Sequence, residues 1–212
     1  PWTDLTAAFP TLSAAAAFAL DVANAPAIVS RAVSTFQAPL PHRYLDADSL
    51  MHAADVQWTD GLSDGAARHV TMVQCAAASV GPVDRLVAEH GGQLSRQVSA
   101  SEAERPMYEF GWNHTTLHAL RSDKSTTYLQ AVLEPSRALQ LVGEVEAEFG
   151  TEELMQHLEV TNFNGRYGFA SLALLWPRSA DGAACNDRLR EILAWHEQRG
   201  MPVFDVRARR PS

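Results

Sequence analysis

The chain has 212 residues, of which 46% are hydrophobic and 20% charged, so it suits a folded globular protein of one domain or two small ones. Its 17 basic and 25 acidic side chains give a formal net charge of −8; such a surface repels phosphate backbones, and we expect no nucleic-acid partner. No stretch approaches the ~20 consecutive apolar residues that cross a bilayer, so we expect no membrane partner.

The first half of the sequence begins with a predicted helix followed by two predicted strands. Thr11 or Ser13 can cap a helix through an alanine-rich stretch that ends at Asn24. Residues 27–36 are rich in β-branched side chains and predict a strand, and the apolar residues 69–76 predict a second one. These elements indicate an α+β arrangement in this half.

Residues 38–68 show little periodicity between these two strands, and we interpret them as an irregular insert. Pro82 then opens a second helix, which Gly91 and Gly92 end. We expect a further strand after this helix, so that the first half has the order helix, strand, strand, helix, strand. Leu5–Phe9 could supply the first strand that this half otherwise lacks.

The second half predicts a strand, a helix and a hairpin in succession. Residues 126–133 form the strand, and residues 135–149 form the helix. Residues 154–163 and 167–176 are both strand-like and flank Asn164-Gly165, a dipeptide typical of tight hairpin turns. The sequence therefore predicts that these two strands pair antiparallel as a hairpin.

The last predicted elements complete a β-α-β-β-α-β order. Asn186 can cap a helix that runs to Gln198, and residues 202–206 predict a short strand. This order is that of a ferredoxin-like unit, and the first half has nearly the same order. We therefore expect an α+β fold in which duplicated ferredoxin-like units form an antiparallel sheet, covered by helices on one face.

The expected organisation is a single domain over residues 1–212. Its parts are a first half (1–98, with the insert at 38–68), a linker segment (99–125), a second half (126–206) and a basic tail (207–212).

The linker segment contains the most conspicuous group of polar and aromatic side chains. His114 and His118 stand four residues apart, so a helix would bring them to one face as a metal-binding pair. They could instead be polar histidines on a linker helix. A third interpretation is a ligand-contacting wall made of Tyr108, Trp112 and His114, which offers stacking area and hydrogen-bond donors.

Three segments of this sequence resemble the corresponding parts of a known protein family. "YEFGWNHTTLHALRSDKSTTYLQ" (108–130), "RYGFASLALLW" (166–176) and "RLREILAWHEQRGMPVFD" (188–205) together resemble bacterial FAD-linked oxidoreductases of the vanillyl-alcohol-oxidase-like superfamily. The resemblance extends from Ala27 to Asp205 and falls within the cap, the substrate-side domain of these enzymes.

The resemblance implies FAD as the cofactor, held mainly by a domain outside this sequence. That FAD-binding domain, on the parent chain or on a partner subunit, is the implied protein partner, and the other implied partner is a small-molecule substrate. The chain begins at Pro1, which fits a piece of a longer protein. A glycine-rich metal motif of some relatives is missing, so we expect no metal. The residues implied to face flavin or substrate are Trp112, Asn113, His114 and His118, then Glu109, Arg121 and Tyr108.

The expected function is therefore that of a substrate-binding cap of a FAD-dependent oxidoreductase that acts on an alcohol or a hydroxy acid. No residue receives a catalytic role, because the hydride acceptor would be the flavin, and the isolated chain is not expected to turn over. The alternative is a stand-alone ferredoxin-like module for ligand binding or homodimer formation. A metal enzyme would need a third ligand beside the two histidines, such as His157 or Glu159. Two cysteines without metal or disulfide spacing favour the cytoplasm.

Overall fold

The computed structural model describes residues 1–38, 69–102, 127–149, 153–175 and 182–203. Within these residues, seven strands form one antiparallel sheet and four α-helices accompany it, so the expected α+β class is confirmed. The predicted insert at 38–68 lies, apart from Ala38, outside the described residues.

The sheet has the strand order β4-β1-β3-β2-β6-β7-β5, in which the first four strands come from the first half of the chain. Every strand pair is antiparallel, and β2 and β6 join the two halves. The strands are β1 (Trp2–Phe9), β2 (Ser30–Phe36), β3 (His69–Ala76), β4 (Gln93–Ser99), β5 (Thr127–Leu133), β6 (Leu154–Phe163) and β7 (Arg166–Leu175).

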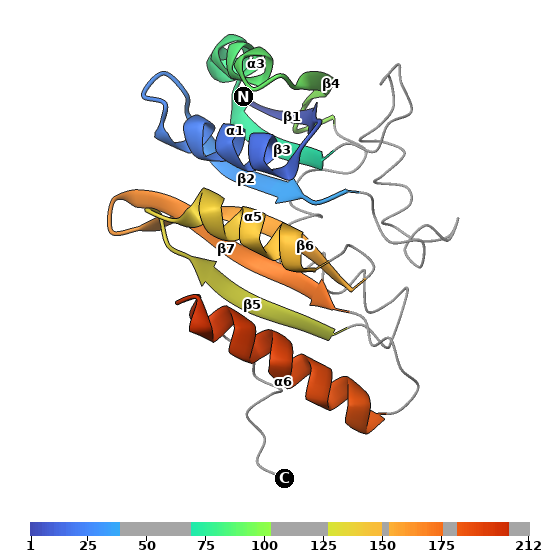
Figure 1. The fold of residues 1–212 in the computed structure, drawn as a ribbon. Coiled ribbons are helices and arrows are strands. Elements are labelled where there is room, and N and C mark those ends of the chain that lie inside the picture. The colour runs from blue at the N-terminus through green and yellow to red at the C-terminus, as the bar shows by residue number, and fades with distance from the viewer. Residues whose placement is uncertain (39–68, 103–126, 150–152, 176–181, 204–212) are drawn as a thin grey trace, which may run out of the picture.

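The helices bury their apolar stripes against one face of this sheet. Figure 1 shows α1 (Leu12–Asn24) and α5 (Ala138–Glu148) side by side on that face, above the strands of the first and second half respectively. The 3₁₀ turn η2 (Ala77–Ser79) precedes α3 (Val80–Glu89), and α6 (Gly182–Gln198) packs beside β5. One continuous core includes Leu5, Phe9, Phe18, Val73, Leu129, Leu141, Leu158 and Phe169.

Several predicted boundaries are confirmed by hydrogen bonds and backbone geometry. Thr11 is the N-cap of α1, and its hydroxyl accepts a hydrogen bond from the Ala14 amide at 3.1 Å. Asn164 and Gly165 both adopt positive φ between β6 and β7, as a two-residue hairpin turn requires. The Asn162 side chain supports this turn by accepting a hydrogen bond from the Gly165 amide.

Other boundaries differ from the prediction for identifiable reasons. Helix α6 begins at Gly182 rather than at Asn186, because Ala183 and Ala184 favour helix strongly enough to extend it past the expected cap. Strand β1 begins at Trp2 rather than at Leu5, because its polar first residues pair with both β3 and β4.

The expected strand at 202–206 is described only at its start. Val203 forms a single bridge with Ala131 of β5, and the Pro202 carbonyl accepts a hydrogen bond from the Val132 amide. Residues 204–206 lie outside the described residues.

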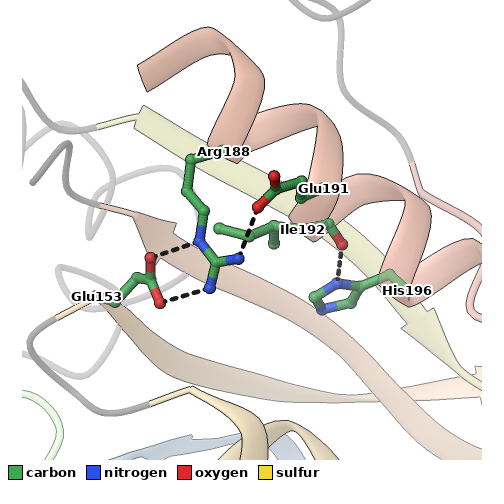
Figure 2. Close-up of polar contacts among 5 residues, drawn as sticks. All are labelled: Glu153, Arg188, Glu191, Ile192 and His196. Atoms are coloured by element: carbon green, nitrogen blue, oxygen red, sulfur yellow. Dashed lines mark hydrogen bonds and ion pairs between the residues drawn. The ribbon is translucent and has the colours of Figure 1, made fainter. Parts of the chain in front are cut away.

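An ion pair fastens α6 to the start of β6 (Figure 2). The guanidinium of Arg188 donates two hydrogen bonds to the carboxylate of Glu153, at 2.9 and 3.0 Å, and a third to Glu191 at 2.9 Å. The Glu153 side chain is only 10% exposed, so the paired geometry of the Arg188 fork satisfies a carboxylate that little solvent reaches.

The described helices are all too short or too polar to cross a membrane.

Replacement of Gly168 with alanine should destabilise the β5–β7 edge. A Cβ there would lie 2.6 Å from the Leu133 carbonyl oxygen, which is backbone and cannot rotate away. We expect a loss of about 1 to 3 kcal/mol in the free energy of unfolding, measured by urea titration. Gly143→Ala is the control, because nothing lies within 4 Å of its Cβ position inside α5, and it should stabilise by about 0.5 to 1 kcal/mol. Equal effects of the two changes would contradict this packing.

Removal of the Arg188 guanidinium should loosen α6. Arg188→Met leaves the shielded Glu153 carboxylate without its paired donors, so the free energy of unfolding should fall by about 1 to 3 kcal/mol. Arg190→Met is the matched control, because Arg190 pairs with Asp187 on the exposed side of the same helix, and it should change stability by less than about 0.5 kcal/mol. Thermal unfolding of both variants tests the difference.

Candidate functional site

The residues that the sequence implied for flavin or substrate contact all lie in the segment 103–126, outside the described residues. They are Tyr108, Glu109, Trp112, Asn113, His114, His118 and Arg121. Their role remains a prediction, and the candidate site among the described residues lies on the sheet.

The face of the sheet that points away from α1 and α5 carries several polar side chains, most of them buried. Because side chains alternate along a strand, the core positions of each strand identify which residues point to the opposite face. The cross-strand register then assembles one row across five strands. Its members in order are Arg96, Thr6, Met72, Ser34 and Glu159.

A polar network lies at one side of this row. The Gln74 side chain donates a hydrogen bond to Asp4 and accepts one from Arg31, so it connects β1, β3 and β2. The Arg31 guanidinium also lies 4.6 Å from the ring centre of Trp2, a cation–π distance. Asp4 and Gln74 are buried, and their mutual hydrogen bond compensates for that burial.

The centre of the face lies where the two halves of the chain meet. Phe36 of β2 and His157 of β6 are direct cross-strand partners, with ring centres 4.1 Å apart and ring planes inclined by 12°. The next pair along the same two strands on this face is Ser34 and Glu159. An aromatic stack, a hydroxyl and a carboxylate are therefore adjacent on this face.

His157 has two fully buried polar atoms on this face that lack a hydrogen-bond partner among the described residues. The residue is completely buried, and neither ring nitrogen has a hydrogen-bond partner in the part of the chain that the structure describes. Its Nε2 atom lies 3.9 Å from Oε1 of Glu159, too far for a direct hydrogen bond. Burial lowers the pKa of His157 to about 3, so the ring is neutral at pH 7 and the contact is not a salt bridge.

A second buried histidine lies on the helix side of the sheet and differs from His157. Nδ1 of His69 accepts a hydrogen bond from the Ala38 amide at 3.0 Å, and its Nε2 lies 4.0 Å from Glu146 of α5. Burial lowers the pKa of His69 to about 4 and raises that of Glu146. His69 therefore has a hydrogen-bond partner, whereas the ring nitrogens of His157 have none within the described part of the chain.

From the sequence, His157 and Glu159 are candidates only for an additional metal ligand beside His114 and His118. Among the described residues, no group of three or more histidine, cysteine, aspartate or glutamate side chains could hold a metal ion. The available signal was the alternation in "LMQHLEVTNF", which puts His157, Glu159 and Thr161 on one face of β6, but it did not reveal which face the helices would cover.

Chemically, this arrangement can bind a small polar group rather than perform a reaction alone. A neutral imidazole offers one donor and one acceptor, and a carboxylate accepts several hydrogen bonds. Comparison with known proteins adds no assignment: no protein-family model matches the chain, and no curated protein is detectably similar.

The buried neutral histidine predicts acid sensitivity. The unfolded chain protonates His157 below its ordinary pKa of 6.5, whereas the folded chain does so only near 3, so acidification between these values favours unfolding. His157→Phe keeps a ring on Phe36 and removes this proton uptake. The variant should therefore lose stability less steeply from pH 7 to pH 4, by up to about 1.4 kcal/mol per pH unit in urea titrations. If the free energy of unfolding fell with pH equally steeply in both proteins, His157 could not be a neutral, buried residue.

Proposed function

We propose that this chain is the substrate-binding cap of a FAD-dependent oxidoreductase of the vanillyl-alcohol-oxidase-like superfamily. The observation that carries the proposal is the polar and aromatic sheet face opposite the helices, with the unpartnered His157 at its centre. A core-facing surface would favour apolar side chains, whereas this face combines aromatic area with hydrogen-bonding groups, as ligand sites do.

The proposal includes a duplicated ferredoxin-like architecture. In the first half, the strand order β4-β1-β3-β2 with α1 and α3 as crossovers supports one unit. In the second half, the order β6-β7-β5, followed by the bridge from Val203 to Ala131, supports a second unit with the same connections. The outer strands β2 and β6 of the two units then pair with each other.

The division of the sheet into two faces supports a role as one wall of an active site. Helices α1 and α5 cover one face, and the other face, where Ser34, Phe36 and His157 are buried as well, is the one that we assign to the substrate. In the intact enzyme, FAD held by a separate domain would accept the hydride from an alcohol or hydroxy-acid carbon. The residues of this chain would orient the substrate and exclude water.

The partners that follow are a FAD-binding domain, on the same parent chain or on a separate subunit, and a small-molecule substrate. We also propose a cytoplasmic location. The isolated chain would bind substrate without turnover, because it lacks the hydride acceptor.

The test is to read the coding sequence on both sides of this chain and to express the whole reading frame. We expect a glycine-rich FAD-binding domain in the same frame or in a neighbouring gene, and a purified protein or complex that carries FAD, detected by its visible absorption. His157→Phe in that holoprotein should raise KM for its substrate more than it lowers kcat, because the residue binds but does not react.

Absence of any FAD-binding domain from the frame and from copurifying proteins would refute the cap. The same sheet face would then belong to a stand-alone ligand-binding module, which the unpartnered His157 favours equally well.

A further inference from the structure

We infer that Asn164, in the turn between β6 and β7, is the asparagine of this chain that deamidates spontaneously, and that Asn162 slows the reaction. Deamidation converts an asparagine side chain to aspartate or isoaspartate without an enzyme, and it is one reason why asparagine is a thermally labile residue. The geometry of this turn is independent of the proposed function.

The reaction starts at the backbone nitrogen that follows the asparagine. After losing its proton to a base in the solvent, the Gly165 nitrogen attacks Cγ of Asn164, and the Cγ–Nδ2 bond breaks, which leaves a five-membered succinimide ring. The departing nitrogen takes up protons from water and leaves as ammonium. Water then opens the ring: cleavage of the bond from the Gly165 nitrogen to Cγ gives aspartate, and cleavage of its bond to the backbone carbonyl carbon gives isoaspartate.

The sequence and the exposure of the turn single out Asn164. Glycine has no Cβ to hinder the attack, and Asn164 is the only asparagine in the sequence that precedes a glycine. Asn164 and Gly165 are both exposed, so solvent base and water reach the peptide bond between them. Asn162 is exposed as well, but it precedes Phe163, whose side chain crowds the attacking nitrogen.

A hydrogen bond protects this exposed turn. Oδ1 of Asn162 accepts a hydrogen bond from the Gly165 amide at 2.7 Å. The same amide must lose its proton and turn towards Cγ of Asn164 before the ring can form, so the reaction requires that this hydrogen bond break. The strands on both sides are paired up to the turn, and the backbone between them can rearrange only by local opening.

Deamidation should weaken the hairpin. Asn164 has a φ of 53°, a conformation that asparagine tolerates better than most residues do. Isoaspartate routes the main chain through the former side chain and so adds one methylene to a two-residue turn, whose length fixes the register of β6 and β7. Molecules that contain isoaspartate should therefore unfold at a lower urea concentration than unmodified molecules.

The experiment follows the mass of one peptide. The 212-residue chain is incubated in mildly alkaline buffer for several weeks, and trypsin then releases residues 138–166. Each deamidation adds about 1 Da, and fragmentation assigns the change to Asn162 or Asn164. We expect the gain at Asn164, at a rate at least ~10-fold below that of a free synthetic peptide 138–166, which contains only the first residue of β7 and cannot form the hairpin.

Two substitutions of Asn162 test its protective role. Asn162→Ala removes the acceptor and should speed the mass gain at Asn164 by about 3- to 10-fold, the worth of one hydrogen bond. Asn162→Asp keeps an acceptor oxygen, so its rate should equal that of the natural chain. Asn164→Gly tolerates the positive φ and is the control that should show no gain at this site. Melting temperatures confirm that each variant is folded.

Equal rates in the natural chain and in folded Asn162→Ala would overturn the protective role of Asn162, and so would an Asn162→Asp variant that reacts as fast as Asn162→Ala. Earlier deamidation of another asparagine would overturn the choice of Asn164, as would its absence from every protein while the free peptide reacts. If Asn162→Ala does not fold, hydrogen exchange of the Gly165 amide in the natural chain decides, because exchange as fast as in the free peptide would exclude the protection.

Discussion

The pairing of β2 with β6 is the contact on which the rest of the structure depends, since it makes one sheet out of two halves of the chain. Three residue pairs form it, Ser34–Glu159, Thr35–Leu158 and Phe36–His157. Gln37 extends the ladder: its amide donates to the Gln156 carbonyl, and its side-chain oxygen accepts a hydrogen bond from the Gln156 amide. Without this pairing β2 and β6 would be open edges, which attract other strands.

This junction also links the sheet to its helices. On the helix side, the hydroxyl of Thr35 bonds with that of Thr71, which in turn donates to the Ala15 carbonyl of α1. The Gln156 side chain donates to the Val142 carbonyl of α5. A slip of one residue in the β2–β6 register would turn Gln156 and Leu158 away from the helices and bury His157 and Glu159 in the core. The register that builds the core is therefore also the one that puts His157 and Glu159 on the face opposite the helices.

Sequence patterns predict the parts of this fold whose signals are local. The cap at Thr11, the positive-φ turn at Asn164-Gly165 and the strand 69–76 need only neighbouring residues, and the structure confirms them. The start of β1 and the start of α6 depend on strand pairing and on helix extension through alanines, so local turn and cap signals misplaced them. Which face of the strands the helices cover is likewise a matter of packing between distant segments.

The site was beyond sequence reasoning for the same reason. Phe36 and His157 are far apart in sequence, and nothing in either segment alone indicates that their rings stack. The sequence directed attention to the histidines of segment 103–126, whereas the described site lies on the sheet.

The contrast between His157 and its polar neighbours is what gives this face a functional interpretation. Asp4 and Gln74 bond with each other, the Thr35 and Thr71 hydroxyls do so as well, and His69 bonds with the Ala38 amide. A phenylalanine or leucine at position 157 would stack or pack on Phe36 without the cost of two buried ring nitrogens. Stability alone would thus favour an apolar side chain here. Among the described residues the His157 ring nitrogens stay unpaired at the centre of the sheet, which a ligand-binding face as proposed above would account for and the stability of the fold would not.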